Sequence, residues 1–211
     1  MPKFSTTPYQ GRCAVHGGRS SIGTIFKGNT EITAFKELAH FTRVTSLASQ
    51  AFAECSNLKS LHMPNSITTM SYGICRACSS LEDVVISTAI TDITQAAFNA
   101  CAIKHLVLHE GLINIRTDYA FGNCTQLLDV TFPSTITGIG TDTFRGCTAL
   151  TEMFFNGTTP PTLGGGNNIL GPTSATWPIY VPDSAVDAYK AASSWALYKN
   201  RVKGISERPT T

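Results

Sequence analysis

Two groups of residues in this sequence have types and spacings suited to chemistry. Cys75 and Cys78 form a C-x-x-C pair, the spacing found in zinc sites and in redox-active thiol pairs. Asp83, His105 and Asp129 recur 22 and 24 residues apart, and a carboxylate beside an imidazole would titrate near neutral pH if the fold brought them together. The interpretation of both groups depends on the elements that position them.

Both groups lie inside a sequence repeat. Every twenty-third residue from Cys55 to Cys147 is a cysteine, and Phe occupies four of the five positions three residues earlier. A period shared by several columns indicates a solenoid, in which each repeat buries its apolar side chains against its neighbours. The predicted structural ladder consists of Phe52, Cys55, Cys78, Phe98, Cys101, Phe121, Cys124, Phe144 and Cys147.

The repeat also accounts for the C-x-x-C pair, because Cys78 belongs to the cysteine column and Cys75 stands in the Phe column. A zinc site would need two more ligands nearby, whereas the neighbouring columns are apolar, so we predict buried structural thiols with no metal and no cofactor. Stacked residues lie about 4.8 Å apart with parallel side chains, and we therefore expect free thiols rather than disulfides. Cys13, outside the repeat, is expected to be an inert thiol.

Each repeat contains two apolar pairs that predict its walls. Pairs such as Leu61/Met63 alternate at period two, which predicts short strands in one parallel sheet. Pairs such as Ile67/Met70 are expected to line the opposite wall, and the A-F-x-x-C segment to close the coil as a short helical or 3-10 turn. The third repeat lacks one residue after Cys101, and we place this deletion in a turn because a shift inside a strand would reverse every side chain.

The consensus L-x-x-L-x-M-P-x-x-I-x-x-M, together with A-F-x-x-C, resembles the BspA-like leucine-rich repeats of Bacteroides-type bacterial surface proteins, which also occur in some protozoa. Residues 31–45 are similar to the usual N-terminal entry of that family, and residues 156–195 to its C-terminal close. The resemblance implies a β-rich repeat solenoid, a right-handed leucine-rich-repeat superhelix with one parallel sheet. It also implies attachment to host proteins or other microbes, although such motifs specify a fold rather than a function.

The sequence predicts one elongated unit with atypical ends, because terminal repeats must face water on one side. The predicted helix of the C-terminal cap starts at Asp183 or Ser184 and ends near Ala196. The expected divisions are a flexible arm at 1–30 that is disordered or docks on a partner chain, an N-terminal cap at 31–50, leucine-rich repeats at 51–156, a loop at 157–178, the C-terminal cap at 179–205 and a loose tail at 206–211.

The outward positions of the predicted strands form a candidate binding surface on the concave face. A solvated sheet face is the simplest interpretation of their polar members, and a cation or polar-ligand site is the alternative. The apolar stripe from Val85 to Phe154 favours a protein-binding surface, unless the 157–178 loop covers it. The candidate binding residues are His62, Asp83, Val85, His105, Val107, Asp129, Thr131, Glu152 and Phe154.

Composition excludes several classes of function. Charged residues make up 14% of the chain, the net charge is +2, and Lys and Arg do not cluster, so a nucleic-acid partner is not expected. A run of about 18 apolar residues is lacking, which argues against a membrane span. Motifs of hydrolases, metalloproteases and nucleotide-binding enzymes are also lacking, so we predict a protein that is not an enzyme.

Two hypotheses for the function remain at this stage. The first is a module at the bacterial cell surface or outside the cell that binds protein or glycan in adhesion or recognition. Residues 1–28 show no apolar signal-peptide region, so a signal would have been removed or the chain would leave its cell by another route. The second hypothesis is therefore a structural, receptor-binding or decorating component of a virion, a phage particle of Bacteroides-like hosts.

Overall fold

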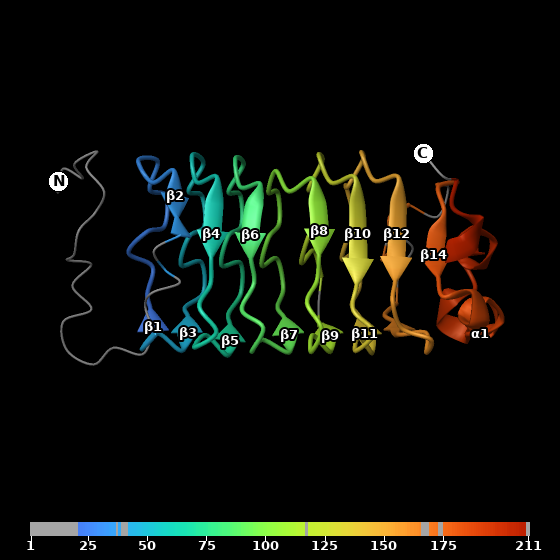
Figure 1. The fold of residues 1–211 in the computed structure, drawn as a ribbon. Helices are drawn as coiled ribbons and strands as arrows, with labels where there is room; N and C mark the ends of the chain where they lie inside the picture. The colour runs from blue at the N-terminus through green and yellow to red at the C-terminus, as the bar shows by residue number, and fades with distance from the viewer. Residues whose placement is uncertain are drawn as a thin grey trace.

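The computed structural model describes residues 21–36, 38, 42–116, 118–165, 169–172 and 175–209. In these residues the chain winds into a solenoid whose coils lie side by side from the N-terminal to the C-terminal end (Figure 1). The predicted fold class is confirmed. Cys13 and the first 20 residues of the predicted arm lie outside the described residues.

The first wall of the solenoid contains the strands that the first apolar pairs predict. All pairings within it are parallel, and inward and outward side chains alternate along its strands. We call the solvent-facing side of these strands the outer face of the first wall; it is the face predicted to be concave. The strands are β2 (Ala34–Phe35), β4 (Ser60–His62), β6 (Asp83–Val85), β8 (His105–Val107), β10 (Asp129–Phe132), β12 (Glu152–Phe155), β14 (Ile179–Val181) and β15 (Val202–Gly204).

The sheet of the first wall is interrupted between β6 and β8, so that β2-β4-β6 and β8-β10-β12-β14-β15 are separate sheets. The interruption coincides with the short third repeat, in which His105 follows Cys101 by four residues instead of five. The deletion lies in the turn, as predicted, because β8 keeps its alternation of exposed, buried and exposed residues. The inward-facing Val84 and Ile86 of the second repeat are only partly buried beside this break.

The second apolar pairs form a second wall that also contains strands, each of two residues. The structure therefore adds a line of parallel strands to the sheet that the sequence predicted. This wall is likewise divided, into β1-β3-β5 and β7-β9-β11-β13. The strands are β1 (Ser21–Ile22), β3 (Ser46–Leu47), β5 (Thr69–Met70), β7 (Asp92–Ile93), β9 (Asn114–Ile115), β11 (Gly138–Ile139) and β13 (Thr162–Leu163).

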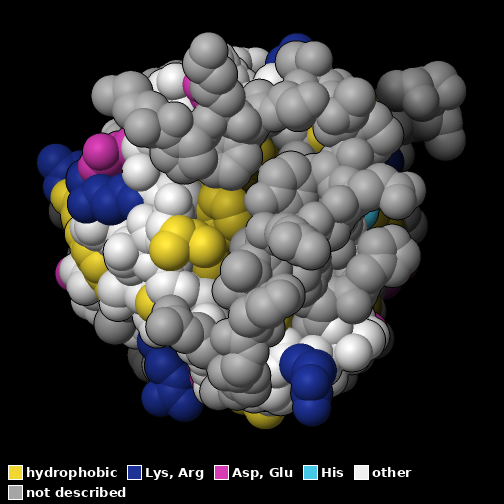
Figure 2. All heavy atoms as spheres, turned by 90° about the vertical axis from the view of Figure 1, so that its left-hand side faces the viewer, with side chains coloured by type: hydrophobic (Ala, Val, Ile, Leu, Met, Phe, Trp, Pro, Cys, Tyr) yellow, Lys and Arg dark blue, Asp and Glu magenta, His cyan; other side chains and the backbone are white. Residues whose placement is uncertain are grey.

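Residues 21–30, the end of the predicted arm, form part of the first coil. β1 pairs with β3, and the ring of Phe26 stacks on Phe52 with 5.3 Å between the ring centroids. Seen from the N-terminal end, hydrophobic side chains lie near the centre of the coil, and Lys and Arg side chains lie toward its rim (Figure 2). This arrangement is the one expected of a solenoid with a continuous apolar interior.

The A-F-x-x-C turns connect the second wall to the first wall and bond to one another along the solenoid. Within a turn, amides bond three residues back, as from Cys55 N to Phe52 O at 3.3 Å. Between turns, the amide of Phe52 donates to Ile74 O at 2.8 Å, and later coils repeat this bond. Two positions in every turn have a left-handed φ between 49° and 79°: Gln50, Gly73, Ala96, Tyr119 and Asp142 in one column, and Glu54, Ala77, Ala100, Asn123 and Gly146 in the other.

The C-terminal end is closed by a cap of short helical segments. The predicted single helix is divided because Ala192 has an extended backbone conformation with ψ 126°. Trp195 and Tyr189 are fully buried over the last coil, where the indole of Trp195 donates to Pro161 O at 2.8 Å. The segments are α1 (Val186–Ala191) and the 3-10 helices Asp183–Ala185, Ser193–Trp195, Lys199–Arg201 and Ile205–Glu207.

A buried arginine ties the cap to the 157–178 segment. The guanidinium of Arg201 lies 3.6 Å above the ring of Trp177 and donates to the carbonyl oxygens of Leu170 and Trp177. Burial lowers the pKa of Arg201 to about 10. The described residues of the segment predicted as a loop thus contain a strand, β13, and contact the C-terminal cap through Leu170 and Trp177.

Candidate functional site

The outer face of the first wall holds the predicted binding residues in the order that the repeat predicts. The register pairs His105 with Asp129 and Asp129 with Glu152 in one column. The other column aligns Val107, Thr131 and Phe154 across β8, β10 and β12. In the first sheet, β4 and β6 align His62 with Val85. The break between β6 and β8 separates the candidate residues into two sets.

Each set contains one histidine–aspartate pair. The His62 Nε2 atom lies 2.9 Å from an Asp83 carboxylate oxygen, and the Lys36 ammonium lies 3.2 Å from the same oxygen. The hydrogen bond from His62, aided by Lys36, lowers the pKa of Asp83. In the second set, the His105 Nδ1 atom lies 2.5 Å from an Asp129 carboxylate oxygen. Asp83, His105 and Asp129 therefore do not form the row of three that the sequence predicted, because β6 and β8 are not paired.

Both pairs are hydrogen-bonded contacts on a solvent-exposed part of the outer face. The side chain of His105 is 64% exposed, and that of Asp83 is 49% exposed. Among the described residues, neither His62 nor His105 hydrogen-bonds to a serine, threonine or cysteine that could act as a nucleophile. A general base would need such a partner or a substrate within hydrogen-bond reach.

The cysteine column has a structural role. Each thiol donates to a main-chain carbonyl in the previous coil: Cys78 to Phe52 O at 2.9 Å, and Cys124 to Phe98 O at 3.2 Å. The six cysteines among the described residues are buried free thiols, and burial raises the pKa of Cys75 and Cys101. Both members of the C-x-x-C pair thus lie in the interior as buried free cysteines. No group of three or more His, Cys, Asp or Glu side chains in the described part of the chain is placed to hold a metal.

Two valines are exposed on the outer face where the sheet is interrupted. Val107 is 74% exposed and Val85 is 47% exposed. Val85 lies one strand from His62, and Val107 lies on the same strand as His105. β6 thus presents Val85 together with Asp83, and β8 presents Val107 together with His105, on either side of the break.

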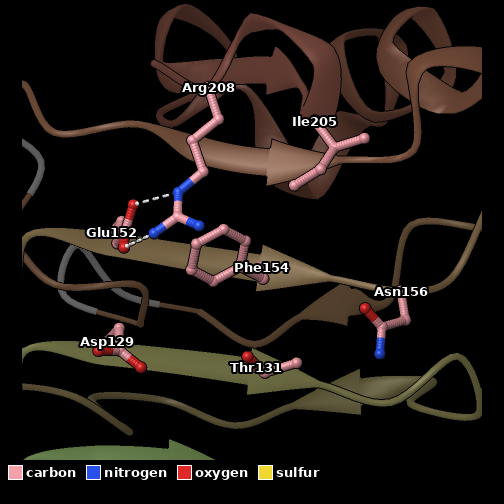
Figure 3. Close-up of a pocket in the computed structure, with 7 residues that line it drawn as sticks. All are labelled: Asp129, Thr131, Glu152, Phe154, Asn156, Ile205 and Arg208. Atoms are coloured by element: carbon pink, nitrogen blue, oxygen red, sulfur yellow. Dashed lines mark hydrogen bonds and ion pairs between the residues drawn. The ribbon is translucent and has the colours of Figure 1, made fainter. Parts of the chain in front are cut away.

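The C-terminal end of the outer face is hollowed into an open pocket of about 410 Å³ (Figure 3). Phe154 lies in this pocket and stacks on Tyr180, with ring centroids 5.4 Å apart. Above it, the guanidinium of Arg208 lies 4.9 Å from the ring centroid of Phe154 and bonds both oxygens of Glu152, at 2.7 and 3.3 Å. The pocket is lined by Asp129, Thr131, Glu152, Phe154, Asn156, Ile205 and Arg208.

Sequence reasoning missed Arg208 and Ile205. Cover by the 157–178 loop was the alternative to an exposed apolar stripe, whereas the group over Phe154 is Arg208, from the segment expected to be loose. The repeat gave no signal for either residue, because both follow its last copy. Arg208 and Glu152 are 56 residues apart in the sequence, so only the fold brings them together.

The repeat defines the family of this chain. Residues 23–151, more than half of the chain, match the BspA type Leucine rich repeat region in six copies. The chain therefore belongs to this family, and the resemblance seen in the consensus is confirmed. The match starts before the first A-F-x-x-C segment and so includes the first coil. A comparison with curated proteins finds no match.

Solved structures resemble this solenoid. A leucine rich cell surface protein from Faecalibacterium prausnitzii A2-165 is 33% identical over 54% of this chain and 30% of that protein, with a TM-score of 0.52. The pneumococcal vaccine antigen PcpA is 16% identical over 82% of this chain and 40% of that protein, with a TM-score of 0.62. A leucine rich repeat protein from T. pallidum is 24% identical over 58% of this chain and 63% of that protein, with a TM-score of 0.50. The latter two show the fold alone, and this chain spans less than half the length of the first two proteins.

None of the helices in the described part of the chain has both the length and the apolar character needed to cross a membrane.

Proposed function

We propose that this chain is a non-catalytic recognition module that binds a protein partner through the outer face of the first wall, in adhesion at a bacterial surface. Val85 and Val107 carry this proposal, because each exposes an apolar side chain on a strand that also holds one member of a histidine–aspartate pair. An apolar centre with a polar rim is the usual composition of a protein-binding surface. The cell-surface protein among the structural relatives supports the location. No observation in the described residues favours the virion hypothesis.

Substitution of Val107 by Asp tests this proposal. The labelled chain is applied to a panel of immobilised extracellular-matrix proteins and to a glycan array. We expect binding to at least one matrix protein, weakened about tenfold or more by Val107→Asp, because a carboxylate would be desolvated at the centre of the contact.

Ile113→Asp provides the matched control. Ile113 is an exposed β-branched residue beside β9, on the second wall of the same repeat. Both variants should unfold at the same temperature as the unmodified chain, since neither side chain is buried. Equal binding by Val107→Asp and the unmodified chain would contradict the proposal, as would binding to the glycan array alone or to no member of either panel.

A further inference from the structure

The pocket at the C-terminal end of the first wall already holds a guanidinium group, that of Arg208. Two nitrogens of Arg208 bond the two carboxylate oxygens of Glu152, and its planar group lies over the ring of Phe154 (Figure 3). Tyr180 supports Phe154 from the next strand. A bidentate carboxylate beside an aromatic ring is a geometry that selects arginine over lysine, because only a planar guanidinium satisfies both groups at once.

The Arg208 contact is an exposed one. Its side chain is 48% exposed, and exposed ion pairs and cation–π contacts each contribute little to stability. The contact is also distant in sequence from the repeat, since it comes from the segment after the last strand, β15. Another guanidinium of the same geometry could therefore replace Arg208 at small cost.

The pocket offers more than Arg208 uses. Asp129 is the register partner of Glu152 on the neighbouring strand and contributes a second carboxylate to the lining. Thr131 and Asn156 supply polar atoms on the other side of Phe154. About 410 Å³ of open volume remains with Arg208 in place, which is enough for parts of a partner segment next to the arginine site.

We infer that Glu152 and Phe154 form a recognition site for an arginine side chain of the partner protein, and that Arg208 occupies this site when the partner is absent. The inference rests on the proposed role of the outer face and specifies one contact within it. Binding then proceeds by exchange of one guanidinium for another, so that the tail of the chain competes with the partner. Removal of Arg208 should therefore strengthen the binding of another arginine side chain to Glu152 and Phe154.

Titration of ¹⁵N-labelled protein with N-acetyl-arginine methylamide, followed by NMR, tests the exchange. We expect Arg208→Ala to bind this probe about five- to tenfold more tightly than the unmodified chain, because the competing tail group is gone. The amide shifts should centre on residues 129–131 and 152–156. N-acetyl-citrulline methylamide, which has the same shape without the charge, should not bind.

Two further variants make the result specific. Arg116→Ala is the matched control, because Arg116 also forms an exposed pair with a carboxylate, that of Asp92, but on the second wall. It should leave probe binding unchanged. Adding Glu152→Gln to Arg208→Ala should abolish binding while Phe154 keeps its place.

The inference is overturned if Arg208→Ala binds the probe no more tightly than the unmodified chain, if Glu152→Gln leaves the gain intact, or if citrulline binds equally well. The test does not depend on the valine surface, since Val107→Asp should not alter binding of the small probe. If Val107→Asp loses binding to the matrix protein while neither the unmodified chain nor Arg208→Ala binds the arginine probe, the arginine site is refuted and the proposed function stands.

Discussion

The A-F-x-x-C turns and the outer face of the first wall follow the same repeat but differ in how strictly they keep it. In the turns, Phe and Cys recur from coil to coil, and each cysteine makes the same bond to the coil before it. On the outer face, the polar column changes from Ser60 through Asp83 and His105 to Glu152. Buried columns must fit identical neighbours above and below, whereas outward side chains are free to vary. A partner can therefore be recognised by the outer face without any cost to the interior.

The largest effect on stability is expected from Phe98→Ala. Phe98 is fully buried and stacks on Phe121 with 5.4 Å between ring centroids, so its removal leaves a cavity between two coils. We expect the free energy of unfolding, measured by urea titration, to fall by about 3–5 kcal/mol. Tyr72→Ala, at a 40% exposed aromatic, should change it by less than about 0.5 kcal/mol. Equal losses in the two variants would show that the Phe column does not form the interior.

A smaller loss is expected when one thiol of the ladder is removed. Cys124→Ala deletes the donor to Phe98 O and leaves this buried carbonyl without that partner. The free energy of unfolding should fall by about 1–3 kcal/mol, the cost of an unsatisfied buried group. A variant as stable as the unmodified chain would mean that the column keeps cysteine for its size alone.

The position directly before each cysteine of the ladder has a left-handed backbone conformation, and two substitutions there should change stability in opposite directions. Gly146 has φ +79°, and a Cβ atom there would collide with the side chain of Asn123, so Gly146→Ala should cost about 1–2 kcal/mol. Ala100 occupies the equivalent position with φ 58°, and Ala100→Gly should stabilise the chain by up to about 1 kcal/mol. Thermal unfolding of both variants measures these changes in stability. Changes of the same sign would contradict the equivalence of the two turns.

The smallest effect concerns the outer face at acid pH. The pKa of Asp83 is lower in the folded chain than its ordinary value of 3.8, so its contribution to stability is present above that value and is lost as pH falls through the folded pKa. Between pH 5 and pH 2.5, Asp83→Asn should lose less stability than the unmodified chain, because it lacks the carboxylate that is protonated in this range. Identical losses, measured as urea midpoints, would show that the His62 contact does not stabilise the fold.

The solenoid and the contents of its interior were predictable from the sequence, because a period of 23 residues in several columns leaves few other folds. The interruption between β6 and β8 was not, since a one-residue deletion shows where the chain is short but not how strand pairing responds. The left-handed positions had a signal that was overlooked: Gly73 and Gly146 stand in columns that other residues fill elsewhere. Arg208 had none, because its contact with Glu152 joins the repeat to a segment outside it.

The most direct test of the difference between interior and outer face is a pooled substitution scan of residues 51–156, read once for protease resistance and once for binding to the matrix protein that the unmodified chain binds most tightly. We predict that substitutions in the Phe and Cys columns reduce protease resistance, and that substitutions of the outward residues from His62 to Phe154 reduce binding while protease resistance is retained. Binding losses confined to unfolded variants, or mapped to the second wall, would contradict this account.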